Sequence, residues 1–406
     1  MQLTEKNNIL LLRIGFVVIL LIAAFQIYSS FPKPEEYHMH NDEGNYFRQA
    51  LTVGEQGMEG YKTIMHNYLD HPELYDTPNP LRILHIQFAS IATDLHTDVR
   101  SLSFLSLFWF LALCILMWFL VKQSLNEQTA LWTVSILAFS PLLNGMATRA
   151  LMDSEICFFT ILSLFFLMRY IRSGDLRDGL FLSLSLGACI LIKESFLALY
   201  PFFPLALLYV LWKEKKLKHI PVLLFSVLPL IIVLLAYLLA FGNLGDVSKV
   251  YHILSTVNVL NPAGYTATYC AGPWYQYFID LFLLSPVVSL LFFFYLGNMF
   301  LNKKKYDLPI QLLLCYVIWF IASHSVLPKN VRYAVSLEPI YALCAALVLI
   351  QVSERFSVAR WRTVSLVIMF SLVVILQIRS FRHYFVKGKL YDPIAYNLLE
   401  LERVIP

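Results

Sequence analysis

The chain has 406 residues, of which 58% are hydrophobic and only 14% are charged. Soluble domains carry roughly 25% charged residues, so a soluble fold could not keep this much apolar side chain away from water. The net charge of +4 carries no nucleic-acid signal, because the basic residues cluster beside apolar runs. The composition therefore excludes a soluble or nucleic-acid-binding protein and predicts helices that cross a membrane repeatedly.

The first apolar run resembles a signal peptide but is too long for one and lacks a clear small-x-small cleavage site, so we expect an uncleaved first span. Five of the six cysteines lie in apolar runs, where cysteine behaves as a small hydrophobe. No CxxC pair or disulfide framework is present.

Apolar runs separated by short polar segments predict an all-α integral membrane protein with about 11 transmembrane helices. We expect one polytopic domain over residues 1–406. The predicted spans are Ile9–Ser29, Ser101–Val121, Ala130–Ala147, Ser154–Ile171, Gly179–Ile192, Phe196–Trp212, Ile220–Phe241, Phe278–Leu301, Leu308–His324, Ala334–Val352 and Trp361–Ile378.

Lysine and arginine gather in alternate short loops, which predicts their side of the membrane. With the N-terminus in the cytoplasm, every inner loop is basic, whereas the C-terminal tail from Arg379 is basic and lies outside, which argues mildly the other way. The inner basic residues are Lys122, Arg169, Arg172, Arg177, Lys213, Lys215, Lys216, Lys218, Lys303, Lys304, Lys305, Arg355, Arg360 and Arg362.

Two long segments, 31–100 and 242–277, then fall on the outer side. Loops of this length in a compact protein are usually functional. In the first segment, apolar spacing predicts helices over Tyr46–Val53 and Leu81–Ile91, lying in the membrane interface. The second of these has a stripe formed by Leu81, Leu84, Phe88 and Ile91.

Two adjacent carboxylates, Asp42 and Glu43, open the first outer segment. A carboxylate here could deprotonate an attacking hydroxyl or bind a metal, with His38 and His40 as further candidate ligands for a divalent cation. The alternative is a solvated loop or a cap for the helix near Tyr46. No HExxH or zinc-ribbon spacing is present.

Further ionisable residues fall at the outer ends of other spans. Charges at membrane depth are costly and usually pair or line a cavity, and cations on the outer side run against the positive-inside tendency. An anionic ligand would account for them, since Arg and Lys are the usual phosphate ligands; the alternative is snorkelling at helix ends. The residues are Arg149, Asp153, Glu155, Lys193, Glu194, His324, Lys329, Arg332 and Tyr333.

Trp274 and Tyr275 precede the eighth predicted span, where they could form part of an aromatic belt or a wall for a sugar ring or prenyl chain. The chain contains no P-loop, no GxGxxG before a helix and no GxSxG. ATP-driven transport, dinucleotide chemistry and an esterase elbow therefore have no support from motifs.

Five segments together resemble integral-membrane glycosyltransferases of the GT-C superfamily, most clearly over about residues 40–200. The nearest groups are the protein O-mannosyltransferase-like family, the aminoarabinose transferase of lipid A and the RgtA-type lipopolysaccharide transferases. The first segment resembles their Asp-Glu-x-x-Tyr signature. The segments are Asp42–Tyr46, Thr77–Arg82, Thr148–Asp153, Gly187–Lys193 and Arg332-Tyr333.

The resemblance implies a GT-C-like fold and inverting transfer of a sugar from a polyprenyl-phosphate-linked donor, with Asp42 as general base and Glu43 assisting it or binding a metal. Asn45 and Asn79 depart from the aminoarabinose branch. The implied ligands of the donor phosphate are Arg82, Arg149, Lys193, Lys329, Arg332 and Tyr333. The implied substrate-pocket residues are Tyr46, Asp153, Glu155, Glu194, Trp274 and Tyr275.

The expected protein is therefore a hexosyl- or pentosyltransferase of a bacterial inner membrane, acting on the periplasmic or extracellular side. Its expected partners are the lipid-linked donor, a glycan, lipid or protein acceptor, and membrane lipids. One alternative is a transporter or flippase of an anionic lipid-linked substrate, which would favour mid-span charges and paired broken helices. Another is a non-catalytic scaffold, which has no need of so many charges at outer helix ends.

Overall fold

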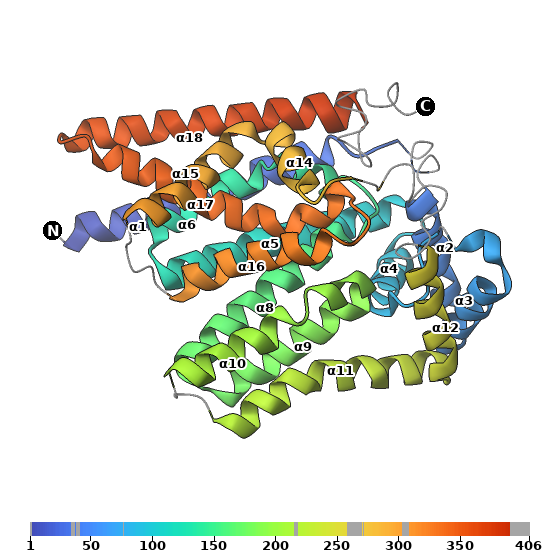
Figure 1. Cartoon of the computed structure of the whole chain (residues 1–406). Coiled ribbons are helices and arrows are strands. Elements are labelled where there is room, and N and C mark those ends of the chain that lie inside the picture. The colour runs from blue at the N-terminus through green and yellow to red at the C-terminus, as the bar shows by residue number, and fades with distance from the viewer. Residues whose placement is uncertain are drawn as a thin grey trace.

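The computed structural model describes residues 2–33, 37, 41–75, 77–214, 218–257, 270, 272–302 and 308–389, and over these residues the regular structure is entirely helical. Long helices form a bundle, and shorter helices cover the end drawn at the right of Figure 1. These shorter helices are α2 (Asn41–Gln56), α3 (Met58–Asp70), η2 (Pro72–Leu74), α4 (Ile83–Leu95) and α12 (Leu244–Ser255).

Within the described residues, seven helices are long and apolar enough to cross a membrane, or eight if the bent pair α6 (Glu127–Ala138) and α7 (Pro141–Ala147) is one span. The all-helical membrane fold is thus confirmed, whereas the number 11 is not confirmed. The seven are α1 (Gln2–Tyr28), α5 (Arg100–Ser124), α8 (Asp153–Ser173), η3 (Glu194–Ala198) with α10 (Phe202–Glu214), α11 (His219–Phe241), η5 (Val331–Leu337) with α17 (Glu338–Glu354), and α18 (Ala359–Phe381) with η6 (Arg382–Lys387).

The other helices of the bundle are shorter. Two of them, α15 and α16, are apolar but below the length of a span. They are α9 (Leu176–Ile192), α14 (Gln276–Leu284), α15 (Pro286–Asn302) and α16 (Leu308–His324).

Two predicted spans are each broken in two at a Ser-Pro pair. The axes of α6 and α7 differ by 63°. There the Ser140 hydroxyl accepts a hydrogen bond from the Leu143 N–H (3.3 Å), and Pro141 starts the second helix. Between α14 and α15, Ser285 is non-helical (φ −135°, ψ 63°), and Pro286 has no N–H with which to continue the first helix. The predicted third and eighth spans are therefore helix pairs.

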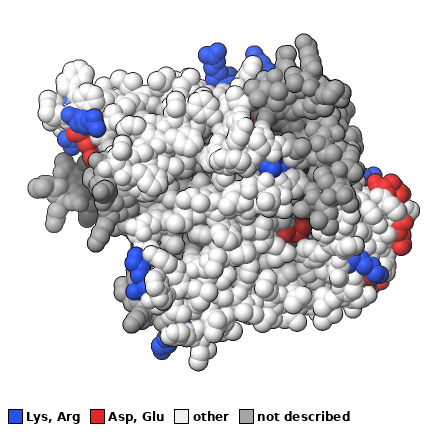
Figure 2. Space-filling view, in the orientation of Figure 1, with Lys and Arg blue, Asp and Glu red and all other residues white. Residues whose placement is uncertain are grey.

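The outer surface of the bundle is apolar along its length. In α1, Leu11, Leu21 and Phe25 are 64–71% exposed, far more than a soluble protein leaves in contact with water. Figure 2 shows a broad uncharged area between the left and right ends of the molecule, with most charged side chains toward its edges. An apolar surface of this kind requires lipid rather than water around it.

The two ends of helix α8 carry different charged residues, with Asp153 at its start and Arg169 near its end. The Arg169 Nε lies 3.1 Å from the Asp178 Oδ1. A helix of 21 residues is about 31 Å long, which matches the hydrocarbon thickness of a bilayer. The basic end and the end that carries Asp153 therefore lie on opposite sides of a membrane-sized layer.

Helices α2 and α4 confirm the predicted helices of the first outer segment, but the core face of α4 differs from the predicted stripe. Its fully buried residues include Ile86 and Ala89, and the helix packs against α2, α5 and α9. Leu84 and Phe88 are only half-buried, and Ile91 is 50% exposed. Leu81, which precedes α4, is fully buried, so the predicted stripe runs from the core at Leu81 to the surface at Ile91.

Close packing of α3 against α2 depends on Gly60. A Cβ at this position would lie 2.7 Å from the Thr52 carbonyl oxygen and 3.0 Å from the Val53 Cα. Because backbone atoms cannot move aside as a side chain can, Gly60→Ala should destabilise the protein by about 1–3 kcal/mol. Thermal unfolding of the purified protein measures this, with Gly44→Ala as control, since nothing lies within 4 Å of a Cβ there. Equal midpoints for the two variants would contradict the prediction.

Candidate functional site

The first turn of α2 sends its two carboxylates to different partners. Successive residues of a helix point about 100° apart, so Asp42 and Glu43 cannot share one contact. Asp42 accepts a hydrogen bond from the Arg332 Nη2 at 2.9 Å, and Glu43 turns toward Arg149. The acidic pair predicted from the sequence thus separates into two sites.

Glu43 is fully buried, and both of its oxygens are engaged. The Arg149 Nε donates to Oε1 at 2.6 Å, the Arg149 Nη2 donates to Oε2, and the Ala150 N–H donates to Oε1 at 2.9 Å. The Arg149 guanidinium also lies over the Tyr37 ring, 5.7 Å from its centroid. A two-pronged pair of this kind fixes α2 to the turn before α8.

Asp42 and Arg332 form the more accessible pair. Their side chains are 23% and 12% exposed, against 0% and 6% for Glu43 and Arg149. Arg332 is the second residue of η5, whose N-cap Asn330 accepts a hydrogen bond from the Arg332 N–H at 3.0 Å. Of the two carboxylates, only Asp42 can therefore be reached by a substrate without disrupting the fold.

Arg82 precedes α4 and makes a two-pronged pair with Glu194 at the start of η3, with N–O distances of 2.9 and 3.0 Å. Its third nitrogen donates to the Tyr46 hydroxyl, which in turn lies 3.9 Å from the Met152 sulfur. Burial raises the pKa of Tyr46, so its hydroxyl stays protonated and serves as a hydrogen-bonding group rather than a base.

Lys193 extends from the end of α9 toward Asp153, with its Nζ 3.2 Å from the Oδ1 and 4.1 Å from the centroid of the Tyr333 ring. Burial lowers the pKa of Lys193 against the opposing effect of Asp153, and the positive charges of Arg332 and Arg82 lower it further. Both guanidinium groups therefore act on the charge of Lys193.

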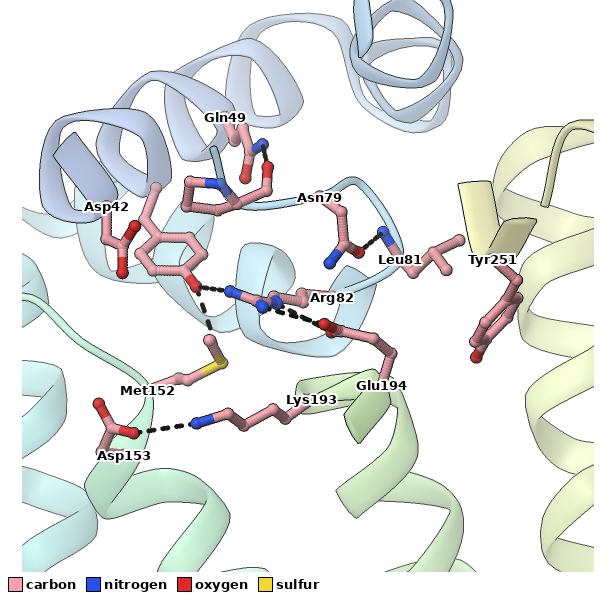
Figure 3. Close-up of polar contacts among 12 residues, drawn as sticks. Asp42, Gln49, Asn79, Leu81, Arg82, Met152, Asp153, Lys193, Glu194 and Tyr251 are labelled. Carbon is pink, nitrogen blue, oxygen red and sulfur yellow. Dashed lines mark hydrogen bonds and ion pairs between the residues drawn. The ribbon is translucent and has the colours of Figure 1, made fainter. Parts of the chain in front are cut away.

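Figure 3 shows that the side chains of Asp42, Arg82, Lys193 and Glu194 lie close together, with Tyr251 at the edge of the group. Four cation–carboxylate pairs surround this region. Because each cation faces one carboxylate, their formal charges cancel, and an anionic ligand must compete with a carboxylate to bind. The pairs are Asp42–Arg332, Glu43–Arg149, Glu194–Arg82 and Asp153–Lys193.

Glu155 forms a buried pair with His85. The His85 Nδ1 is 2.8 Å from the Glu155 Oε2, and both side chains are at most 2% exposed. The Tyr46 ring meets the His85 ring edge-on, with 4.6 Å between centroids. His85 thus packs against the ring of Tyr46, a role that the sequence did not single out.

Three other predicted residues are not members of the four pairs. Trp274 and Tyr275 are 61% and 45% exposed and contact each other, 5.6 Å between ring centroids. The Lys329 Nζ donates to the Leu327 carbonyl at 3.5 Å, and burial lowers the pKa of Lys329. Tyr333, in contrast, joins the group through its contact with Lys193.

The candidate metal ligands do not form a set within the described part of the chain, where no group of three His, Cys, Asp or Glu residues could hold a metal ion. His38 and His40 lie outside the described residues. Glu43 does not fit the role of ligand, because its oxygens already accept three N–H groups. We therefore derive no step through a metal.

Sequence reasoning missed residues that hold the site in shape. Asn79 is 1% exposed and accepts a hydrogen bond from the Leu81 N–H at 3.0 Å, so it shapes the turn that leads into Arg82. Met152 contacts the Tyr46 hydroxyl. Asn79 and Met152 carry no charge, so only the turn chemistry of Asn79 offered a signal.

Comparisons with known proteins show which family and which folds this chain resembles. Residues 79–238 match the family model described as dolichyl-phosphate-mannose-protein mannosyltransferase. This range includes Arg82, Arg149, Asp153, Lys193 and Glu194, but not the acidic pair. A search of curated protein sequences finds no match.

Solved structures with the same fold include oligosaccharyltransferases and an ArnT. The archaeal oligosaccharyltransferase AglB from Archaeoglobus fulgidus, in complex with an inhibitory peptide and a dolichol-phosphate, matches with a TM-score of 0.60 at 12% identity over 90% of this chain. An Archaeoglobus fulgidus oligosaccharyltransferase tethered to an acceptor peptide gives 0.60 at 13% identity over 90% of this chain. The chain spans 55% of each of these two relatives.

ArnT from Cupriavidus metallidurans bound to undecaprenyl phosphate matches with a TM-score of 0.59 at 13% identity, over 91% of this chain and 75% of ArnT. The resemblance noted from the sequence is confirmed by this fold and by the family model. This chain is an all-helical membrane protein with the fold of the GT-C glycosyltransferases, and over residues 79–238 it resembles the dolichyl-phosphate-mannose-protein mannosyltransferase family.

Proposed function

We propose that the protein is a glycosyltransferase that moves a sugar from a polyprenyl-phosphate-linked donor to an acceptor hydroxyl at the outer face of a membrane. The observation that carries the proposal is the Asp42–Arg332 pair. It is the accessible member of a group of ion pairs at one end of an apolar helical bundle. AglB and ArnT, which share the fold, are described with dolichol-phosphate and undecaprenyl phosphate.

The donor phosphate would bind among Arg332, Lys193 and Lys329, while its prenyl tail stays in the membrane. Phosphate oxygens suit a guanidinium fork and ammonium groups. Arg82 and Tyr333 border the same region, since Arg82 holds Tyr46 and Tyr333 contacts Lys193. We assign Arg149 a supporting role, because Glu43 already engages its Nε and Nη2.

Binding of the phosphate would also prepare the base. Arg332 now neutralises Asp42. When a phosphate oxygen takes over Arg332, Asp42 loses its counter-charge and becomes free to accept a proton. The acceptor oxygen then attacks the anomeric carbon, the bond from that carbon to the phosphate oxygen breaks, and the bonding electrons leave with the lipid phosphate. The acceptor proton moves to Asp42, and direct attack inverts the anomeric centre.

The remaining assignments rest on this scheme. Tyr46, Asp153, Glu155 and Glu194 hold the pocket in shape, and Trp274 and Tyr275 offer an aromatic surface to a sugar or prenyl chain. We also propose that the donor carries a hexose or a pentose and that the acceptor is a glycan, a lipid or a protein. The membrane would be a bacterial inner membrane, with the N-terminus of the protein in the cytoplasm.

A membrane assay with labelled polyprenyl-phosphate sugars tests the function. Membranes containing the protein should release polyprenyl phosphate and transfer the label to a non-lipid-phosphate product, whereas membranes without it should not. A panel of hexose and pentose donors would identify the sugar. If no donor is turned over in membranes that are supplied with cell-envelope acceptors, the proposal is contradicted.

A transporter of an anionic lipid-linked substrate is the second candidate, favoured by the broken helices α6–α7 and α14–α15. Proteoliposomes separate the two functions. Counterflow of an intact labelled lipid without release of its sugar would support transport, whereas release of the sugar only in the presence of an acceptor would support transfer.

Arg332→Gln should raise the KM for the donor by about 10- to 100-fold, because a hydrogen bond to a charged group contributes about 1.5–3 kcal/mol. Initial rates against donor concentration measure this change. Arg48→Gln is the matched control, since Arg48 lies on α2, is bonded to Asn45 and is not part of the four pairs. A donor KM that is unchanged in Arg332→Gln would remove Arg332 from the phosphate site.

A further inference from the structure

A cavity that is lined by none of the residues of the four ion pairs lies between the α14–α15 break and the C-terminal part of α18. Its volume is about 330 Å³, within the range of roughly 300–1,000 Å³ found for small-molecule sites. None of the described residues that line it is acidic. In this respect it differs from the candidate active site, where each cation faces a carboxylate.

One end of this cavity is polar and basic. Arg379 and Ser380, near the end of α18, and His383, one turn further, all line it. Here α18 passes into the π-helical turn η6, in which the Gly388 N–H donates to the His383 carbonyl at 3.0 Å. Turns of this kind are rare and are often found at functional sites.

The opposite wall combines apolar side chains with an unsatisfied hydroxyl. Leu284 of α14 and Val288 of α15 line the cavity beside Ser285, and Leu376 of α18 lines it too. Ser285 is only 5% exposed, and its Oγ has no hydrogen-bond partner among the residues described. A buried hydroxyl without a partner is costly, so a ligand with hydrogen-bonding oxygen atoms would stabilise it.

The surroundings identify the class of ligand. Leu372 of α18 and Leu290 of α15 are each 56% exposed on the apolar flanks of the two helices, so hydrocarbon surrounds the cavity in the membrane. Arg379 is exposed at its end, and cations in a membrane span mark a polar or anionic partner. The cavity therefore offers a phosphate a basic end and an acyl chain an apolar wall.

We propose that this cavity binds an anionic phospholipid, with its phosphate at Arg379 and His383 and an acyl chain against α15 and α18. The inference does not rest on the proposed glycosyl transfer. It does suggest a link to the candidate active site, because α14 packs both against α18 and against η5, which carries Arg332.

Native mass spectrometry of the full-length, delipidated protein tests the proposal. Titration with phosphatidylglycerol should show a tight site that the double variant Arg379→Gln/His383→Gln weakens about tenfold or more. The matched control is Arg382→Gln/Lys387→Gln, which removes basic residues from the same turn at positions that do not line the cavity. Phosphatidylcholine should bind more weakly than phosphatidylglycerol to the wild-type protein.

Further experiments distinguish a lipid site from a site for free phosphate and from a general effect of surface charge. Leu376→Trp should fill the cavity and block the lipid without changing charge, provided that its thermal unfolding matches the wild type. Inorganic phosphate should not displace phosphatidylglycerol; complete displacement would point to a site for free phosphate and overturn the lipid assignment. Equal loss of binding in the double variant and its control would reduce the effect to surface charge and also overturn it. Asp42→Asn should bind the lipid normally, so this test is independent of the proposed function.

Discussion

Asp42→Asn should lower the rate of sugar transfer by about 10²- to 10⁴-fold, the usual contribution of a general base. The amide keeps the size of the carboxylate and an oxygen that can accept the hydrogen bond from Arg332, so the fold should be retained. The variant also removes the negative charge that competes with a phosphate for Arg332. We therefore expect kcat to fall while the KM for the donor stays unchanged or decreases.

The measurement is the initial rate of label transfer by purified protein, with thermal unfolding as the test of folding. Glu73→Gln is a suitable control, because Glu73 lies in the same outer segment, is exposed and pairs only with His71 among the described side chains. Full activity of Asp42→Asn would show that another group accepts the proton. A rise in donor KM at unchanged kcat would instead make Asp42 a binding residue.

Glu43→Ala should have the largest effect on stability, about 3–5 kcal/mol, because it leaves the Arg149 guanidinium buried without its carboxylate. It also removes the acceptor of the Ala150 N–H. The midpoint of thermal unfolding in detergent should fall accordingly. Replacing both members, as Glu43→Met with Arg149→Met, should restore much of the loss, because apolar side chains of similar size can replace a buried pair at little cost.

This comparison also distinguishes a structural role for Glu43 from a chemical one. If Glu43 only fixes α2, activity should follow stability, and the double variant should recover part of both. A single variant that unfolds like the wild type but has lost transfer would assign Glu43 to the reaction itself. Addition of divalent cations to the wild type and the double variant then tests whether any metal requirement depends on this carboxylate.

The sequence predicts the helices well because apolar length and polar breaks are local properties. The predicted span Leu308–His324 coincides with α16, and Ser154–Ile171 lies within α8. The two predicted spans that are not single helices also have a local cause. The Ser-Pro pairs at 140–141 and 285–286 divide two predicted spans, and both were visible in the sequence as breaks.

The pairing of charges could not be predicted in the same way. Asp42 and Arg332 are separated by 290 residues in the chain, and Glu43 and Arg149 by 106. Composition and resemblance brought these residues into one candidate site. Only the tertiary structure, which brings α2 near Arg332 of η5 and near the turn before α8, decides which carboxylate meets which cation. The buried His85–Glu155 pair was missed for the same reason, since a histidine in a polar segment carries no local sign of a partner 70 residues away.

The contact between Asp42 and Arg332 has a consequence for the charge balance of the proposed reaction. A lipid-linked sugar phosphodiester carries one negative charge, and the lipid phosphate that leaves can carry nearly two. Over the same step Asp42 gains a proton and loses its own charge. The total charge around Arg332 is thus conserved, while one unit moves from the aspartate to the phosphate. Release of the lipid phosphate would therefore be favoured once Asp42 loses its proton and can compete for Arg332 again, which makes proton departure a step that resets the enzyme.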